Sequence, residues 1–545
     1  MAFNYFYQQA ILILSVTALL LLPLFASATT YYVSATGNDS ATGTSAEQAW
    51  KTIGKVNDTP FQAGDQILFE GGSSFEGSIW VRSTAQGTAA QPLVFNSYGP
   101  NRARILSGTS YGFYAENNGG IEVRNLEFVG SGRLTNTNSG VVFHLDLPNT
   151  RLQHVVLDNL SVQGYRDRGL SIGSWNGSSG YDQVRITNCT TSANGEAGLG
   201  SYAQSLAAHH DWYVGYCLTF DNTGRADVTN THTGSGIVLS GVDGALIEHC
   251  EAHHNGALNA NAAGGPVGIW GWNCNRLVIQ HCESHHNQTG TSRDGGGFDL
   301  DGGCTNSVLQ YNYSHDNDGP GYLLTQYAEA PPMHDLVIRY NISENDGRRG
   351  GQGALTFWSS GANGGIVRAS VHNNTFYLSP PADGSRPNIV SILSEGISEV
   401  SVRNNILQAT GGLPLLTSAT TQGIVLQGNA YWGSGQTLQL TWGTKSYTSL
   451  AAWRTACGQE QIGSRATGLE VDPRLQQPGV GGTVAVQGSG RALNSLTAYQ
   501  LHPSSRLVGA GLNLLTEFKQ DPGPHDFFGT PVPAQATKRS IGASE

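Results

Sequence analysis

The chain has 545 residues, of which 13% are charged, about half the share that is usual for a soluble domain, and 72 are glycine. This composition excludes long helical bundles and coiled coils, which need many Glu, Lys and Ala residues, while the 39% of hydrophobic residues argues against disorder. The formal net charge of −11 argues against nucleic acid and anionic membranes as partners, because both attract basic surfaces.

The first 28 residues have the pattern of a secretory signal peptide. Residues 10–25 are almost entirely apolar, and the small residues 26–28 form a cleavage site, although residues 1–9 contain no Lys or Arg. An uncleaved membrane anchor is the alternative, but the run is short and Pro23 interrupts it. We therefore expect cleavage near Ala28, a secreted, extracellular or periplasmic protein with no membrane association afterwards, and a monomer.

A four-residue pattern that starts with an apolar residue recurs eleven times along the chain, beginning with Val123-Arg-Asn-Leu126. Its fourth positions are 24 to 34 residues apart. They are Leu126, Leu160, Cys189, Cys217, Cys250, Cys282, Asn312, Asn341, Asn374, Asn405 and Asn429. Each unit alternates apolar and polar residues and has Gly and Asn at its breaks, which indicates short strands and no helix. Units of this length that stack at roughly 4.8 Å predict an all-β solenoid of parallel strands.

Six of the seven cysteines fall on repeat positions that Leu, Val, Met or Asn occupy in other units. We therefore expect them to be reduced, buried side chains, and neither disulfides nor zinc ligands, since the chain has no C-x-x-C pair. The repeated asparagines predict two internal amide ladders. One would run from Asn312 to Asn405, and the other would contain Asn194, Asn222, Asn255, Asn287 and Asn317.

Three segments resemble the secreted right-handed parallel β-helix proteins of the pectate-lyase-like superfamily. They are the start of the mature chain (31–39, 50–53 and 64–72), the repeat, and the end (471–474, 501–507 and 540–545). The resemblance implies a short N-terminal helical cap with the first strands in 29–110, β-helix repeats in 111–432 and a closing region in 433–545. It also implies a carbohydrate-active protein, since the superfamily contains lyases, hydrolases, epimerases and binding proteins.

The segment Gly297-Phe-Asp-Leu-Asp301 predicts a strand with two outward carboxylates. If Phe298 and Leu300 point inward, Asp299 and Asp301 lie on the outer face about 7 Å apart. By the same parity, the outer face carries Trp270 and Trp272 one turn away, and Thr356 and Trp358 on the other side. Carboxylates flanked by exposed indoles are what a sugar-binding cleft requires, because indoles stack on pyranose rings and carboxylates handle hydroxyls and protons.

The neighbouring loops supply further candidates. His254, His286 and Arg293 are expected to contact substrate, although histidines at repeat positions more often bond to loop backbone. The segment 294–301 somewhat resembles the aspartate strand of polygalacturonase-type hydrolases. His315-Asp-Asn-Asp318 falls where that family has its second aspartate pair. The family's first catalytic aspartate would align on Gly296, and its Gly-His-Gly and Arg-Ile-Lys motifs are missing.

Asp299, Asp301, Asp316 and Asp318 are therefore the predicted catalytic residues. No cofactor is expected to be required. The alternative for the same region is a calcium site that uses Asp294, Asp299 and Asp301, because neighbouring outward carboxylates repel each other unless a cation, a substrate or a shared proton is present.

Three functions stay open, all with an extracellular polysaccharide as partner. The first is glycoside hydrolysis, in which Asp299 or Asp301 acts as general acid. The second is a polysaccharide lyase that acts on uronates. Since no Lys lies between positions 56 and 444, an arginine, a His or bound calcium would have to assist its chemistry. The arginines are Arg276, Arg293, Arg339, Arg348 and Arg349. The third is a non-catalytic carbohydrate-binding or cell-surface solenoid.

Overall fold

The computed structural model describes residues 28–487, 492–533 and 538–545. The predicted signal peptide therefore lies, apart from Ala28, outside the described residues. Within the described ranges, no helix combines the length and the apolar character that crossing a membrane would require.

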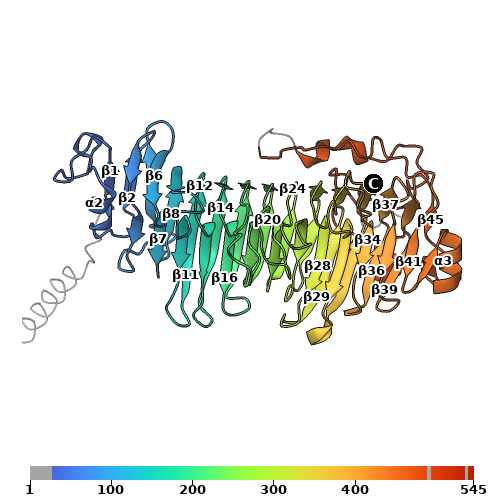
Figure 1. The fold of residues 1–545 in the computed structure, drawn as a ribbon. Coiled ribbons are helices and arrows are strands. Elements are labelled where there is room, and N and C mark those ends of the chain that lie inside the picture. Colours follow the sequence, from blue (N-terminus) through green and yellow to red (C-terminus); the bar gives the residue numbers. More distant parts are fainter. Residues whose placement is uncertain (1–27, 488–491, 534–537) are drawn as a thin grey trace, which may run out of the picture.

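The described chain winds into an elongated solenoid of about 12 turns (Figure 1). Each turn places one strand in each of three sheets, in the order A, B, C, and the strands of successive turns pair in parallel. The prediction of an all-β solenoid of parallel strands is confirmed.

Sheet A has 15 strands in the described residues. They are β1 (Thr30–Val33), β2 (Gln66–Glu70), β5 (Leu93–Tyr98), β8 (Ile121–Arg124), β11 (Arg151–Asp158), β14 (Gly180–Thr187), β17 (His209–Gly215), β20 (Val242–Glu248), β23 (Asn275–Gln280), β26 (Val308–Gln310), β29 (Met333–Arg339), β32 (Ile366–His372), β36 (Val400–Arg403), β39 (Ile424–Gln427) and, beside β32, β35 (Ile397–Ser398).

Sheet B has 14 strands in the same described part of the chain. They are β3 (Ser74–Glu76), β6 (Ala103–Gly108), β9 (Leu126–Gly130), β12 (Ser161–Gln163), β15 (Thr190–Ser192), β18 (Leu218–Phe220), β21 (Glu251–His253), β24 (Glu283–His285), β27 (Tyr313–His315), β30 (Ile342–Glu344), β33 (Thr375–Leu378), β37 (Ile406–Ala409), β40 (Ala430–Trp432) and β45 (Leu469–Glu470).

Sheet C also has 14 strands within the described ranges, the last of which is antiparallel. They are β4 (Ile79–Val81), β7 (Phe113–Glu116), β10 (Val141–His144), β13 (Arg168–Ser174), β16 (Ala197–Ala203), β19 (Ser235–Ser240), β22 (Val267–Trp272), β25 (Gly296–Leu300), β28 (Tyr322–Gln326), β31 (Leu355–Ser359), β34 (Val390–Ile392), β38 (Leu416–Ser418), β41 (Leu440–Trp442) and β42 (Lys445–Tyr447).

Helices occur at the two ends of the solenoid and in the segment that follows it. Near the start, α2 (Ile53–Asn57) begins at Thr52, whose hydroxyl accepts the Lys55 N–H, and it buries Ile53 and Val56. The remaining short elements are η1 (Ala46–Gln48), η2 (Ala362–Gly364), α3 (Leu450–Cys457), the hairpin β43 (Gln461–Ile462) and β44 (Arg465–Ala466), η3 (Leu493–Ser495), η4 (Thr497–Tyr499) and α4 (Leu514–Phe518).

The four-residue repeat forms the bend between sheets A and B. Its third residue adopts a left-handed backbone, with φ of 51° at Asn125 and 54° at Asn159, a conformation that Asn tolerates better than most residues. Its fourth residue then faces the interior. The amide ladder is confirmed there, with side-chain bonds of 3.1 Å from Asn312 to Asn341 and 3.0 Å from Asn341 to Asn374.

The second ladder is also confirmed and ends on a carboxylate. It runs from Asn194 through three further asparagines to Asn317, whose amide donates to Asp346 at 2.7 Å. All seven cysteines are free thiols; six are buried in the core, and Cys457 is half-buried. The prediction of reduced core cysteines is confirmed for the six repeat positions.

After β45 the chain turns back and runs along the outside of sheet B (Figure 1). We call residues 471–487 the returning segment. Its apolar residues and those of the following residues pack against outward side chains of sheet B, among them Tyr313, Ile342, Tyr377 and Ile406. The returning segment therefore covers this face of sheet B, and the outer face of sheet C carries the candidate active site.

Candidate active site

The predicted aspartate strand is β25, in the middle of sheet C. Asp299 pairs with Trp270 of β22 on one side and with Leu323 of β28 on the other, and Asp301 follows the strand directly. Both side chains have the predicted outward parity. Asp299 is nevertheless only 3% exposed and Asp301 is half-buried, because the connections of neighbouring turns cover this part of the outer face.

Asp294, Asp299 and Asp301 form one electrostatic group, which we call the acid cluster. Burial raises the pKa of Asp299 well above its usual value, and the charges of Asp301 and Asp294 raise it further. Burial also raises the pKa of Asp301 to about 7, against the lowering effect of a hydrogen bond from the Gly302 N–H at 2.6 Å. The charged neighbours of Asp299 and Asp301 are thus other carboxylates, which favours protons on this strand at neutral pH.

Asp294 lies in the connection before β25 and has contacts that favour its charged form. Burial raises the pKa of Asp294, but the Gln352 amide, the Gly265 N–H and the charge of Arg293 act in the opposite direction. The Gly265 N–H donates to Oδ2 of Asp294 at 3.0 Å. Burial outweighs these contacts, so the pKa of Asp294 is still raised. Asp294 nevertheless has more partners for a negative charge than Asp299 or Asp301 has.

Trp270 does not present an exposed indole, so this expectation is wrong. The side chain is 3% exposed, packs with Ala197, Val238 and Val267, and its indole N–H donates to Ser235 Oγ at 3.1 Å. The ring of His232, from the connection before β19, lies 5.3 Å from the indole. Outward parity on sheet C thus does not ensure exposure, because the long connections pack against this face.

Trp272 and Trp358 stay available beside Asp301. Extending the strand register by one residue places Asp301 between Trp272 and Thr325, and Thr325 pairs with Trp358. Trp358 is 39% exposed and Trp272 is half-buried. The half-buried Tyr327 also lies near Asp301, whose charge contributes to raising the pKa of this phenol to about 12 after the larger effect of burial. Aromatic side chains that a sugar ring could stack on therefore lie near Asp301.

A cavity of about 400 Å³ lies farther toward the N-terminus on the same outer face. Its lining includes Tyr111, Tyr114, His144, Trp175 and Tyr202. Trp175 is 58% exposed and its ring lies 5.3 Å from that of Tyr202, and Tyr202 Oη bonds to Nδ1 of His144 at 2.8 Å. Exposed aromatic rings around a polar cavity suit the C–H faces and hydroxyls of a sugar.

Carboxylates in this cavity are paired with arginines. Arg225 bonds to Asp167 at 2.7 Å, and Arg168 bonds to Glu196 at 2.6 Å. Burial raises the pKa of Asp167, and the charge of Glu196 adds to this, while the nearby arginines lower it. These pairs suit hydrogen bonding to substrate better than proton transfer. We call this cavity the aromatic pocket. It was missed in the sequence because its residues come from four strands of sheet C and from the connections beside them.

The aromatic pocket and the acid cluster lie along one row of outward positions. His144 pairs with Gly173, and Gly173 pairs with Tyr202 of β16. One turn after Tyr202, Ser240 of β19 pairs with Trp272 of β22, and Asp301 lies one further turn along. At roughly 4.8 Å per turn, the row from Tyr202 to Asp301 spans about 14 Å. One extended saccharide can therefore reach both features.

The other predicted site residues lie elsewhere on the turns. Asp316 follows sheet B directly and accepts a bond from His315 Nδ1 at 3.0 Å, while Asp318 accepts the Thr289 N–H at 3.1 Å. Neither is among the residues that shift the pKa of Asp299 or Asp301. The structure thus does not bring them into the acid cluster.

The predicted substrate-binding residues of the loops divide in the same way. His254 and His286 occupy the bends after β21 and β24, and their rings stack at 5.2 Å. They belong to the bend between sheets B and C and not to the aromatic row. Arg293 is exposed, and its charge acts on Asp294, so it alone of the three reaches the acid cluster.

The acid cluster also contains the three carboxylates that were predicted from the sequence to be calcium ligands. Oδ1 of Asp299 is buried and has no hydrogen-bond partner among the described residues. A proton, a water molecule or a hard cation would satisfy it.

Comparison with known proteins agrees with this architecture. A family model described as "Right handed beta helix region" matches residues 172–376. The chain is a right-handed parallel β-helix protein. Its resemblance to the pectate-lyase-like superfamily is confirmed at the level of the fold.

Two relatives are lacto-N-biosidases. The chain is 26% identical over 452 residues to a lacto-N-biosidase of Bifidobacterium longum subsp. longum, an alignment that covers 65% of this chain and 27% of that protein. The chain thus spans about a quarter of this relative's length. The crystal structure of the GH136 lacto-N-biosidase from Eubacterium ramulus aligns with a TM-score of 0.52 at 20% identity, covering 69% of this chain and 68% of that chain. Pectate lyase Pel9A aligns with a TM-score of 0.40 at 13% identity and covers 94% of this chain.

Proposed function

We propose that this β-helix protein is a glycoside hydrolase that cleaves a saccharide bound along the outer face of sheet C. The acid cluster carries the proposal: one buried and two half-buried carboxyl groups act on each other, with Trp272 beside Asp301 and Trp358 two turns farther along the same face. Acidic groups that burial and like charge hold protonated near neutral pH are what glycosidic cleavage requires. The similarity to two lacto-N-biosidases, which are glycoside hydrolases, supports this class of reaction.

Asp301 and Asp294 have different roles in the proposed reaction, because their environments favour different protonation states. Asp301 is half-buried with a pKa of about 7, so it can give its proton to the leaving oxygen of the glycosidic bond. Asp294 has donors from Gly265 and Gln352 that stabilise a negative charge, so it can act as base toward water or as nucleophile. Asp299, whose pKa burial raises well above the usual value, stays protonated beside them.

Asp316 and Asp318, the predicted partner carboxylates, are replaced by Asp294 in this proposal. Their catalytic role stays a prediction, which their Asn variants test directly.

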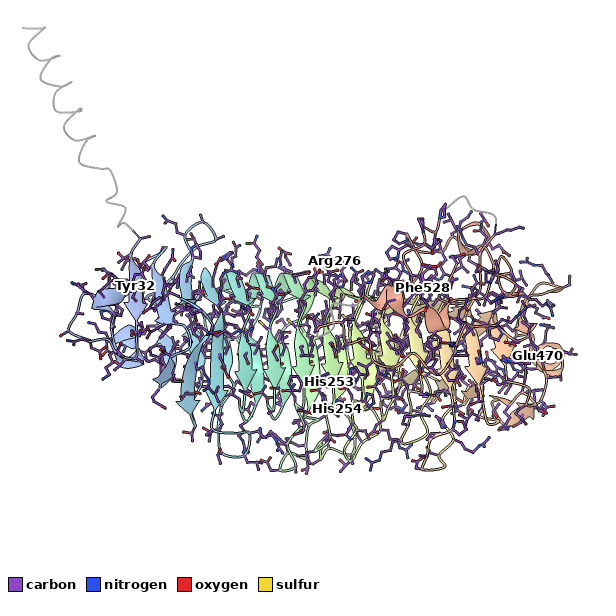
Figure 2. The ribbon with its side chains drawn as sticks, turned by 90° about the horizontal axis from the view of Figure 1, so that it is seen from above. Tyr32, His253, His254, Arg276, Glu470 and Phe528 are labelled. Atoms are coloured by element: carbon purple, nitrogen blue, oxygen red, sulfur yellow. The ribbon has the colours of Figure 1, made fainter. Side chains whose placement is uncertain are left out.

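The lyase alternative is supported less well by the positions of the arginines. Arg276 pairs with Asp243, Arg339 pairs with Asp521, and Arg348 bonds to the Ser379 carbonyl. Arg276 belongs to β23 of sheet A, at the upper edge of the solenoid in Figure 2, and not to sheet C. Among these arginines, Arg293 is the one whose charge acts on the acid cluster in the described part of the chain, so few cations are placed to neutralise a uronate there.

Substrate and location are further parts of the proposal. The names of the relatives suggest oligosaccharides of the lacto-N type, alongside the extracellular polysaccharides that the fold resemblance implies. We propose export of a monomer after removal of residues 1–28. Calcium at Asp294, Asp299 and Asp301 is the competing role for the cluster. It predicts a melting temperature that rises with added calcium and falls with chelator.

The deciding experiment is a panel of polysaccharides and lacto-N-type oligosaccharides. Reducing ends and the absorbance of unsaturated uronate products are measured together, with Asp301→Asn and Asp294→Asn as inactive controls. Asp211→Asn, at an exposed position of sheet A, is the matched active control. Reducing ends alone support hydrolysis, and both signals together support a lyase. Binding without either signal would contradict the enzyme proposal and support a binding protein.

A further inference from the structure

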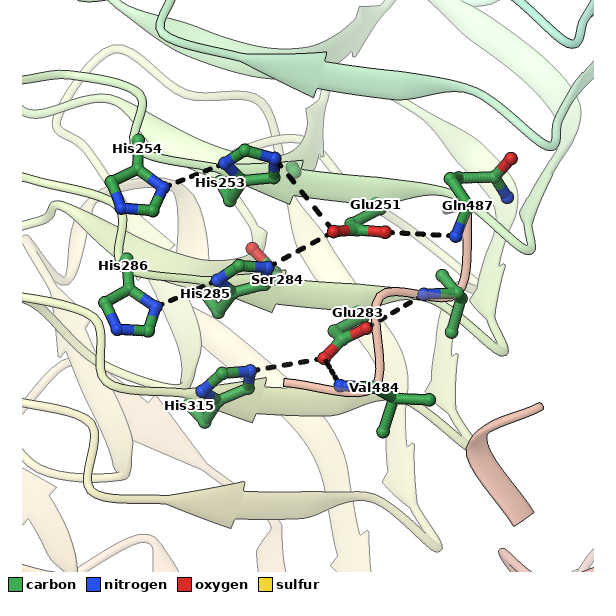
Figure 3. A network of polar contacts seen from close by, with 12 residues as sticks. Glu251, His253, His254, Glu283, Ser284, His285, His286, His315, Val484 and Gln487 are labelled. Carbon is green, nitrogen blue, oxygen red and sulfur yellow. Dashed lines mark hydrogen bonds and ion pairs between the residues drawn. The ribbon is translucent and has the colours of Figure 1, made fainter. Parts of the chain in front are cut away.

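Three successive bends between sheets B and C carry paired ligand-type side chains. The pairs are His253 with His254, His285 with His286, and His315 with Asp316. The facing atoms are 2.8 Å apart in the first pair and 2.9 Å in the second, Nδ1 to Nδ1 in both, and 3.0 Å in the third, Nδ1 to Oδ2. Figure 2 places the first pair midway along the solenoid, and Figure 3 shows the histidine pairs side by side.

The left-handed backbone of the second residue makes these pairs possible. His254, His286 and Asp316 have φ of 55°, 52° and 52°, which turns each side chain back toward the preceding residue. The stack then brings the pairs together, since the rings of His285 and His315 lie 4.7 Å apart and nearly parallel.

A buried carboxylate lies behind two of these imidazoles. Nε2 of His285 lies 3.3 Å from Glu251, and Nε2 of His315 lies 3.2 Å from Glu283 (Figure 3). The carboxylate holds a proton at Nε2, so each Nδ1 remains the nitrogen that can bond to a metal ion. In the metal-free protein Nδ1 of His315 donates to Asp316, and a bound ion would take the place of that proton. Histidines that bind metals have this arrangement of an outer carboxylate.

We propose that His286, His315 and Asp316 bind one divalent transition-metal ion of the zinc class. The ligand atoms of the three residues all lie within 4.8 Å of one another, and Asp316 and His286 are not fully buried, so an ion can enter. Two ligands bonded at about 2.0–2.2 Å at an angle of 90–110° are roughly 2.9–3.5 Å apart, which matches the 3.0 Å of the third pair. Two imidazoles and one carboxylate suit zinc, cobalt or nickel better than calcium, which takes oxygen ligands.

Glu283, His285 and His315 form a second convergent group, but it is less suited to an ion. All three are buried, and the Glu283 carboxylate already accepts the N–H groups of Val484 at 2.7 Å and Val486 at 3.2 Å. Glu283 therefore serves as the outer carboxylate of His315 and not as a ligand.

The proposed ion would join two successive turns at the point where the chain leaves sheet B. One of these turns continues from His286 through Asp294 to β25. Metal binding would thus fix the start of the connection that carries Asp294, which makes the site structural rather than catalytic.

The test uses full-length protein without a histidine tag, treated with EDTA and then titrated with Co²⁺ as a spectroscopic probe. We expect one ion per chain and visible absorption that Zn²⁺ removes. His286→Gln and Asp316→Asn should each weaken binding by at least about tenfold. His254→Gln is the matched control, since it changes the same bend one turn earlier, where the pair has no carboxylate, and its binding should equal that of the wild type.

Circular dichroism and the metal-free melting temperature establish that each variant is folded. A wild-type protein that binds no Co²⁺ or Zn²⁺ at millimolar concentration would overturn the proposal, and the pairs would then be a hydrogen-bonded stack only. Equal affinities in the wild type, His286→Gln and Asp316→Asn would also overturn it. Because the readout is absorption, the result is independent of whether the protein hydrolyses a saccharide.

Discussion

The Glu283 carboxylate accepts a hydrogen bond from the backbone N–H of Val484 at 2.7 Å, across 201 residues of sequence. Glu344 and Glu251 make equivalent bonds to the N–H groups of Gly481 and Gln487, each at 3.0 Å. Buried glutamates of sheet B thus hold the returning segment, strand by strand, along the solenoid (Figure 3).

Glu283→Ala should loosen the returning segment. The side chain is 0% exposed and accepts from Val484, Val486 and His315, so its removal leaves buried donors without a partner. We expect a loss of about 3 kcal/mol in the free energy of unfolding, by analogy with other buried charged acceptors. Chemical denaturation and limited proteolysis of the returning segment measure it. Glu329→Ala, at an exposed position, should change neither, and a fully stable Glu283→Ala would contradict the assigned role.

Asp301→Asn and Asp294→Asn should each lower kcat/KM by at least about a hundredfold, because each variant removes proton transfer or charge from the acid cluster. The melting temperature should not fall, since both changes remove a buried charge that has a raised pKa. Steady-state kinetics and calorimetry provide the two readouts. Activity equal to that of the wild type in both variants would remove the acid cluster from the reaction.

The pH dependence follows from the raised pKa of about 7 at Asp301. As a proton donor, Asp301 is active only while protonated, so kcat/KM should fall as the pH rises above about 7. The sign for stability is the same. The folded pKa of Asp301 exceeds its unfolded value. Its contribution to the free energy of unfolding is therefore fully present below about pH 4 and is lost as the pH rises to about 7. Melting curves of Asp301→Asn should lack this component, and an unchanged pH profile would contradict the shifted pKa.

The tryptophans should separate into two classes. Trp358→Ala removes an exposed ring and should raise KM more than it lowers kcat, with little change in stability. Trp270→Ala leaves a cavity in a packed cluster, so it should lower stability by about 3–5 kcal/mol instead. Trp175→Ala should raise KM for long substrates more than for short ones, because the aromatic pocket lies three turns from Asp301. Equal effects of the Trp270 and Trp358 changes on KM would contradict this division.

The cysteines should react only after unfolding. Burial raises the pKa of the Cys189, Cys250 and Cys304 thiols well above the usual value, and six of the seven side chains are inaccessible. Titration with Ellman's reagent should find at most Cys457 in the native protein and all seven thiols after denaturation. Recovery of a single thiol from denatured protein would contradict the reduced core.

The sequence by itself determined the solenoid, because each turn needs the same residue types at the same positions. The bend after sheet A needs a left-handed residue, as at Asn125, and the interior position after it needs a side chain that stacks on its own kind, as at Asn312 and Cys282. Local constraints of this sort recur at a fixed spacing and are therefore visible without coordinates. The outward parity of Asp299 and Asp301 followed from the same alternation.

Only the tertiary structure decided which outward residues are accessible and which carboxylates meet. Trp270 and Asp299 are buried and Trp358 is exposed, although all three have the same parity, because connections of different length fold over sheet C at different turns. Asp294 joins Asp301, and Asp316 does not, because their positions depend on where each connection crosses from one sheet to the next. The aromatic pocket depends on contacts between side chains about 30 residues apart, and strand alternation carries no information about the paths of the connections that complete it.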